Sequence, residues 1–272
     1  MSKNKKNFTV QARPGRKAKK SLGQNFLKSN LALKKIIEAG EISPEDIILE
    51  IGPGKGALTE KLLEKSNHII AVEKDQNLFV FLSEKFAKEI KNKKLTLKED
   101  DILKVQAGPG QYKVVANIPY NITGAILKKF LTEKNQPSMM VLMVQNEVAK
   151  RICVQAEPGR RRKESILSIS VKAYGEPKII MKVPTRYFSP APKVDSAIIS
   201  IKNISRKTFI ENKINEKKFW EIVRAGFAHK RKKLSSNLKN LQVHTGYGHG
   251  VELGNKRAED LSLEDWISLA KN

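Results

Sequence analysis

A short apolar run followed by a glycine-rich loop constrains the fold of this chain more than any other feature. The run is Ile47-Ile48-Leu49-Glu50-Ile51, and Gly52-Pro53-Gly54-Lys55-Gly56 follows it directly. Residues 57–63 then have the pattern of a helix. Strand, glycine loop and helix in this order open a nucleotide-binding α/β unit, because the glycines let the backbone approach a ligand closely. We therefore expect a doubly wound sheet.

Acidic residues end the next two strand candidates. Glu73 closes the apolar run 68–72 at about 20 residues from the glycine loop, where such units place the acid that binds a ribose. The run that begins at Leu95 leads into Glu99, Asp100 and Asp101, of which Asp101 fits the strand end best; a solvated turn is the alternative. The glycine spacing matches neither a dehydrogenase nor a P-loop. Together these features favour binding of adenosine without a pyrophosphate.

A fourth strand candidate, Val114 to Ala116, ends in the tetrapeptide Asn117-Ile118-Pro119-Tyr120. The Asn117 side-chain oxygen and a backbone carbonyl held by the following proline can accept hydrogens from an amine, and Tyr120 offers a face for stacking. The pattern indicates a nucleobase site, and an ordinary strand-ending turn is the alternative. Ligands bind at the carboxyl ends of the strands in a doubly wound sheet, so we expect this tetrapeptide, Gly52, Glu73 and Asp101 to line one crevice.

These motifs, in this order, resemble the ribosomal RNA adenine N6-dimethyltransferases, and most closely their bacterial small-subunit branch. The resemblance covers nearly the whole chain and is carried by residues 21–27, 50–59, 72–75, 101–103, 116–122, 145–151 and 188–197. It implies an α/β, Rossmann-like, S-adenosylmethionine-dependent methyltransferase fold with a small C-terminal all-α domain.

The resemblance also implies the reaction and its residues. Methyl groups would pass from S-adenosylmethionine to N6 of two adjacent adenines near the 3′ end of small-subunit (16S) ribosomal RNA, within an immature 30S subunit. The transfer would be a direct in-line displacement that needs no general base. The residues expected to bind the cofactor are Asn25, Leu27, Gly52, Glu73, Asp101 and Asn117. Those expected to hold the target base are Asn117, Ile118, Pro119, Tyr120 and Phe188.

Two other functions stay open at this point. One is a resistance-type enzyme that methylates adenine N6 in large-subunit ribosomal RNA, against which the segment 188–197 and the tail from Arg257 to Trp266 speak. The other is a non-catalytic RNA-binding protein of ribosome assembly, which would be expected to have lost a residue of the donor or base site. The RNA that gains dimethyladenosine would discriminate between these functions.

The charge of the chain fits a polyanionic substrate. Lys and Arg number 52 against 28 Asp and Glu, a formal net charge of +24, which points to phosphate contacts. The first twenty residues hold eight Lys and Arg and no acid, and we interpret residues 1–16 as a disordered basic arm rather than a mitochondrial transit peptide. The expected RNA contacts, for which a merely solvated face is the alternative, are Arg160, Arg161, Arg162, Lys230, Arg231, Lys232 and Lys233.

The remaining sequence divides the chain into domains and limits the classes of site. We expect the methyltransferase domain over residues 17–205 and a small helical RNA-binding domain over 206–272, because Phe219, Ile222, Val223 and Phe227 trace one face of a helix. The four histidines do not form a metal-ligand spacing, which excludes a zinc deaminase. One cysteine, Cys153, and no apolar stretch of membrane-spanning length predict a cytoplasmic protein, which we expect to be a monomer.

Overall fold

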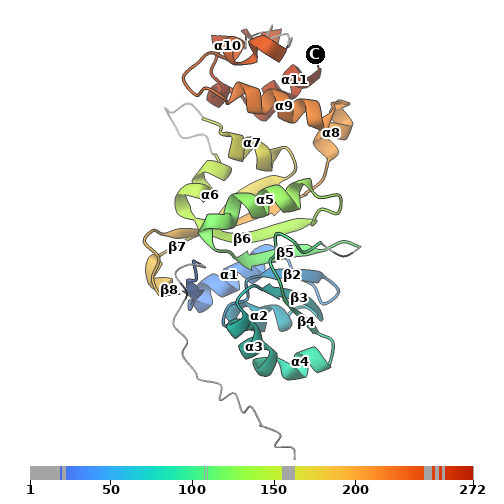
Figure 1. The fold of residues 1–272 in the computed structure, drawn as a ribbon, viewed down its shortest axis with the longest axis vertical. Coiled ribbons are helices and arrows are strands. Elements are labelled where there is room, and N and C mark those ends of the chain that lie inside the picture. Colours follow the sequence, from blue (N-terminus) through green and yellow to red (C-terminus); the bar gives the residue numbers. More distant parts are fainter. Residues whose placement is uncertain are drawn as a thin grey trace, which may run out of the picture.

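The computed structural model describes residues 19, 23–106, 108, 110–154, 163–241, 247–248, 251–252 and 255–271. The predicted basic arm and Arg160, Arg161 and Arg162 lie outside these residues. The molecule is elongated, with α8 (Lys207–Asn212) to α11 (Leu263–Lys271) at one end and α3 (Gln76–Lys85) and α4 (Ala87–Lys91) at the other (Figure 1). Within the described ranges, no helix combines the length and the apolar character needed to cross a membrane.

A seven-stranded sheet forms the centre of the molecule. Its order is β4 (Leu95–Glu99), β3 (His68–Glu73), β2 (Ile47–Ile51), β5 (Lys113–Asn117), β6 (Met139–Gln145), β9 (Ser196–Lys202), β7 (Glu176–Val183). Strands β4, β3, β2, β5 and β6 are parallel, and β9 runs antiparallel to both of its neighbours. From β2 the chain proceeds first to β3 and β4 and then to β5 and β6 on the other side. The direction therefore switches between β2 and β5, which is where such sheets bind ligands.

Helices cover both faces of the sheet, as the predicted doubly wound architecture requires. One face packs against α1 (Asn30–Gly40), α2 (Ala57–Leu63) and α3, and the other against α5 (Thr123–Thr132), α6 (Asn146–Ile152) and α7 (Ile166–Lys172). In β6, Met140 and Leu142 join one apolar cluster, whereas Val141 and Met143 join the other. Because both faces of this strand are buried, its sequence is a continuous apolar run rather than an alternating one.

The tail is mainly helical, as the sequence predicts, but it is not all-α, because the two-residue strands β10 (Tyr247–Gly248) and β11 (Val251–Glu252) pair within it. It contains α8, α9 (Glu216–Gly226), α10 (Leu234–Leu238) and α11. Phe219, Ile222 and Val223 are buried, which confirms the apolar face expected from their spacing. Tyr174, which follows α7, packs its ring 5.3 Å from that of Phe209 and accepts a 2.9 Å hydrogen bond from the indole of Trp220. We propose residues 206–272 as a second unit that shares one apolar core with the first.

Two short strand pairs and several 3-10 turns complete the chain. The first pair joins β1 (Phe26–Leu27) to β8 (Phe188–Ser189) in antiparallel register, so a segment near the start of the chain lies against one from its last third. The second pair is β10 (Tyr247–Gly248) with β11 (Val251–Glu252). The 3-10 turns are η2 (Tyr120–Ile122), η3 (Thr185–Tyr187), η4 (Lys239–Leu241) and η6 (Ala258–Asp260).

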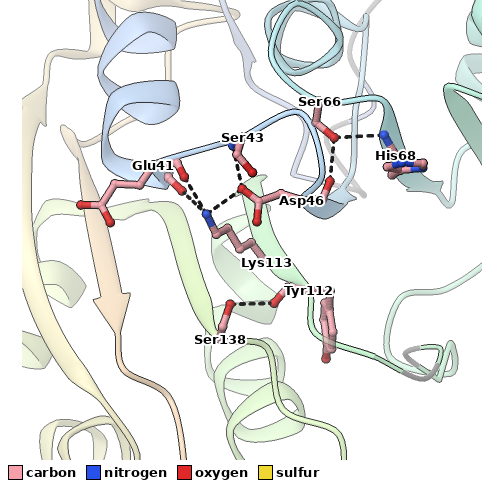
Figure 2. A network of polar contacts seen from close by, with 9 residues as sticks. Glu41, Ser43, Asp46, Ser66, His68, Tyr112, Lys113 and Ser138 are labelled. Carbon is pink, nitrogen blue, oxygen red and sulfur yellow. Dashed lines mark hydrogen bonds and ion pairs between the residues drawn. The ribbon is translucent and has the colours of Figure 1, made fainter.

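The amino ends of the central strands are joined by a polar network around Lys113 (Figure 2). The Lys113 ammonium donates to the backbone carbonyl of Glu41 at 2.6 Å and to the Asp46 carboxylate at 2.8 Å. The same carboxylate accepts the backbone N–H of Ser43 at 2.7 Å. The Ser66 hydroxyl donates to the Asp46 carbonyl at 2.7 Å. This network fixes the loop between α1 and β2 to the start of β5, on the edge of the sheet opposite to the ligand edge.

Candidate functional site

A cavity of about 630 Å³ lies at the carboxyl ends of β2, β3 and β5, where the strand order reverses. Its walls come from the glycine loop, the ends of these strands, and the segment that leads into β1. The structure thus brings together residues from distant parts of the sequence. Of the residues predicted for donor and base binding, the lining includes Asn25, Leu27, Gly52, Glu73, Asp101, Asn117, Ile118, Pro119 and Tyr120.

The glycine loop gives the cavity its open floor. Gly52 has φ +63°, and a Cβ built there would meet no atom within 4 Å, so the space that a side chain would occupy belongs to the cavity. Gly56, at φ +80°, is pressed so closely against the Phe86 ring that a Cβ would lie 2.6 Å from it. Glycine is needed at position 56 because the Phe86 ring packs closely there, and at position 52 because a side chain would fill space that is open to a ligand.

Glu73 holds the loop from the end of β3. Its carboxylate is 6% exposed and accepts the backbone N–H of Asp75 at 2.8 Å and that of Gly54 at 3.1 Å. Burial raises the pKa of Glu73, and these two N–H donors oppose the shift in part. A carboxylate has about four acceptor positions, so Glu73 can still accept hydrogen bonds from a ligand.

Glu50 is a site residue that the sequence analysis missed. Its carboxylate is 1% exposed, lines the cavity, and has no hydrogen-bond partner within the described residues. Burial raises the pKa of Glu50 to about 8; the neighbouring Thr59 hydroxyl acts to lower this pKa, and the charge of Glu73 adds a smaller rise. The available signal was an acid inside an otherwise apolar strand. A buried carboxylate without a partner is costly, so this part of the cavity suits a ligand that brings a cation.

The third strand end supplies an ion pair rather than a free acid. Asp101 lies just after β4 and accepts from the Lys74 ammonium at 2.8 Å and from the Leu103 N–H at 3.0 Å. These hydrogen bonds lower the pKa of Asp101. Asp100 also lines the cavity, whereas Glu99 does not. The geometry therefore removes Glu99 from the three acids that the sequence left open.

A clip that the sequence analysis also missed holds the segment before β1. Asp75 is 4% exposed, and its carboxylate accepts from the Lys19 ammonium at 2.9 Å and from the Gln24 amide at 3.0 Å. Burial acts to raise the pKa of Asp75, but these two donors lower it below its ordinary value. Nothing in the sequence pairs residues so far apart. The clip places the Asn25 backbone carbonyl within 3.2 Å of the Asn117 amide nitrogen, which donates to it.

That hydrogen bond leaves the Asn117 side-chain oxygen as a free acceptor within the described residues. Tyr120 is half-buried beside it, and its hydroxyl forms a 2.6 Å hydrogen bond with the Ser196 hydroxyl. Ile118 is buried and contributes to the lining of the cavity. Phe188 is 3% exposed and is not among the lining residues, so its role in holding the base stays a prediction.

The predicted RNA contacts lie away from the cavity. Lys230, Arg231, Lys232 and Lys233 are all exposed in the turn after α9. In Figure 1 the chain turns there on the side of the molecule where α6 and β8 lie.

The comparisons with known proteins agree with this geometry. A family model described as "Ribosomal RNA adenine dimethylase" matches residues 15–272. The chain is 42% identical over 265 residues to "Ribosomal RNA small subunit methyltransferase A" of Dehalococcoides mccartyi (strain CBDB1), covering 93% of this chain and 87% of the relative.

Two solved structures share the fold. A dimethyladenosine transferase from Plasmodium falciparum is 27% identical, with a TM-score of 0.73, and the match covers 90% of this chain and 95% of the other. The 23S rRNA methyltransferase ErmE is 24% identical, with a TM-score of 0.69, and the match covers 91% and 100%. The second likeness concerns the fold alone.

Proposed function

The chain belongs to the ribosomal RNA adenine dimethylase family, and we propose that it dimethylates N6 of two adjacent adenines near the 3′ end of small-subunit ribosomal RNA. It is an S-adenosylmethionine-dependent methyltransferase with a Rossmann-like α/β fold, as the sequence predicted. One observation carries the proposal: the acceptors of Asn117 and the ring of Tyr120 share a cavity with the buried acids Glu50 and Glu73.

The residues of the cavity fit the methyl donor. S-adenosylmethionine supplies an activated methyl group on a sulfonium. Its ammonium is the cation that the unpaired Glu50 carboxylate requires, and the remaining acceptor positions of Glu73 suit two ribose hydroxyls. Asp101 can accept from the adenine amine of the donor, while Asn25 and Leu27 cover it.

The residues at the end of β5 fit the acceptor. Asn117 Oδ1 and a backbone carbonyl of the tetrapeptide accept the two N–H groups of adenine N6, and Tyr120 stacks on the ring. These hydrogen bonds favour a pyramidal nitrogen whose lone pair points toward the donor. Positioning and electrostatics then supply the acceleration, and the proton leaves after the nitrogen has become cationic.

We place the reaction on RNA within an immature 30S subunit in the cytoplasm, with the protein acting as a monomer and without a metal. The curated relative is named for the small subunit, whereas the resemblance to the 23S enzyme is one of fold. The large-subunit alternative and the non-catalytic alternative therefore remain as outcomes of the test.

The test is the identity of the modified RNA. Purified protein is incubated with radiolabelled S-adenosylmethionine and with immature small or large subunits, and the nucleosides are then separated. We expect label in N6,N6-dimethyladenosine at two adjacent small-subunit positions. Label confined to large-subunit RNA would establish the resistance-type activity, and donor binding without any label would establish the non-catalytic one. The Asn117→Ala variant is the control, expected to be slower by about a hundredfold or more.

A further inference from the structure

The hydroxyl of Tyr120 has a specific partner in the sheet. It lies 2.6 Å from the hydroxyl of Ser196, the first residue of β9. Tyr120 itself belongs to the short turn η2, whose preceding residue makes no side-chain cap. Within the described residues, Ser196 provides the single hydrogen bond to that ring. The face on which a base would stack is thus oriented through a residue of another strand.

Ser196 is held rigidly enough to orient a ring. It is fully buried and pairs with Gln145 of β6 on one side and Val183 of β7 on the other. Its neighbour Asp195 accepts the Asn146 N–H through its carbonyl at 2.9 Å and the Thr185 N–H through its carboxylate at 3.1 Å. The Lys182 ammonium lies 2.9 Å from the same carboxylate. Ser196 is therefore held in place at the start of β9, between β6 and β7.

The chemistry of the pair suits a positioning role. Burial raises the pKa of Tyr120 and the bond to Ser196 opposes this shift, so the phenol stays neutral and its hydroxyl remains available for hydrogen bonding. A phenol side chain without this bond could tilt about its side-chain torsions, because Tyr120 is half-buried and borders the cavity. Stacking depends on the angle between the ring and the base, so freedom of the ring would reduce productive alignment.

We infer that Ser196 is a positioning residue that fixes the Tyr120 ring for stacking on the target adenine. This inference rests on the proposed function. It predicts that the two hydroxyls act as one unit, so that removing either has the same effect as removing both. It also predicts that Ser196→Ala leaves donor binding unchanged, because Ser196 does not line the cavity.

A double-mutant cycle tests the inference on the full-length protein. Tyr120→Phe, Ser196→Ala and the double variant are compared in single-turnover methylation of immature small subunits at saturating S-adenosylmethionine. Each single variant should be about three- to tenfold slower, the scale of one hydrogen bond, and the double variant no slower than Tyr120→Phe. The Kd for the immature subunit and the affinity for the donor should stay at the parental values.

A second measurement reports on stacking without chemistry. The fluorescence of RNA that carries 2-aminopurine in place of a target adenine should be quenched when the parent binds. All three variants should quench this fluorescence less, and to the same extent as one another. Ser200→Ala is the matched serine control, because Ser200 lies in the same strand, is 1% exposed and has no hydrogen-bond partner within the described residues. Tyr112→Phe is the matched tyrosine control, since that hydroxyl bonds the Asn135 carbonyl outside the cavity.

The outcomes are distinct. Rates and quenching at the parental level in the variants, or independent effects that multiply in the double variant, would overturn the inference. If Ser196→Ala does not fold, as judged by thermal unfolding, Tyr120→Phe decides through its quenching and rate. A parent that methylates no RNA would instead contradict the proposed function, and the quenching data would still report on the ring.

Discussion

Glu50 lies one residue before the end of β2 and Glu73 ends the adjacent β3, yet their surroundings give them different chemistry. Glu73 is satisfied by two backbone N–H groups and is ready to accept more hydrogen bonds. Glu50 has no hydrogen-bond partner within the described residues, and burial raises its pKa to about 8, which favours the protonated form at neutral pH in the free protein. An ammonium needs the ionised carboxylate, so binding of the donor should displace a proton from Glu50.

The first prediction concerns this proton. Because the carboxyl pKa is raised, the carboxylate is the minor form below about pH 8, and donor affinity should rise with pH by up to about tenfold per unit below that value. In Glu50→Gln the affinity should be weaker and the slope absent. Calorimetry between about pH 5.5 and about pH 7.5 measures both. An unchanged slope in the variant would mean that the proton comes from another group.

The second prediction concerns Glu73. Glu73→Ala should weaken binding of S-adenosylmethionine by about 2 kcal/mol, roughly thirtyfold, because charge-assisted hydrogen bonds to the ribose are lost. Glu73→Gln keeps one acceptor oxygen and should lose less. Isothermal calorimetry on variants shown to be folded is the measurement. Parental affinity in Glu73→Ala would remove this residue from the donor site.

At the scale of elements, the two edges of the sheet have separate tasks. The carboxyl edge carries the cavity, while the amino edge is fastened by Lys113 and Asp46. Burial acts to raise the pKa of Asp46, but the hydrogen bonds from Lys113 and Ser43 lower it below its ordinary value. The ionised form is therefore favoured by folding, and this contribution to stability is present above the unfolded pKa and lost as pH falls through the folded pKa.

The third prediction follows from the lowered pKa of Asp46. Asp46→Asn should lower the free energy of unfolding by about 2 kcal/mol at pH 7, and the difference from the parent should shrink below about pH 4. Denaturant unfolding at several pH values measures this. Glu211→Gln, which breaks the exposed pair with Lys207, should change stability by less than about 0.5 kcal/mol. If Asp46→Asn and Glu211→Gln lowered the free energy of unfolding equally, the network around Lys113 would contribute no special stability.

Sequence patterns predicted the elements better than the contacts between them. The helix 57–63 and the strand ending at Glu73 are confirmed with their bounds, because glycine turns and apolar runs are local signals. The site residues at strand ends followed from the sheet rule alone. The Asp75 clip and the Tyr120–Ser196 bond could not be predicted in this way, since they join distant positions that carry no shared pattern. Glu50 is different, because an acid inside an otherwise apolar strand is a local signal that the sequence itself carries.

At the scale of the whole molecule, the property to explain is the large excess of positive charge. We propose that the exposed turn after α9 contacts phosphates, together with residues 160–162. Catalytic residues can hold a base turned out of its stack only if other contacts fix the surrounding RNA, and phosphate contacts do so without reading sequence. The turn after α9 lies on the same side of the view in Figure 1 as β8, whose Ser189 lines the cavity.

The fourth prediction tests this surface. Replacing Lys230, Arg231, Lys232 and Lys233 by Gln should weaken RNA binding at physiological salt and flatten its salt dependence by up to roughly three units of slope. Donor affinity should not change. The matched control replaces four exposed lysines in α4 and the turn after it, at the other end of the molecule in Figure 1, namely Lys88, Lys91, Lys93 and Lys94. Equal losses in both quadruple variants would indicate a general charge effect rather than a binding surface.

The pairing of β1 with β8 has a consequence during synthesis of the protein. Phe26 and Leu27 line the cavity, and their strand β1 can pair with β8 only after Phe188 and Ser189 have been synthesised. A ribosome adds about 5–20 residues per second, so roughly four to thirty seconds pass between the synthesis of the glycine loop or the strand ends and the synthesis of that partner. The growing chain therefore has an incomplete donor site for most of its translation, and an enzyme that modifies ribosomes becomes competent only as its own ribosome nears the end of the message.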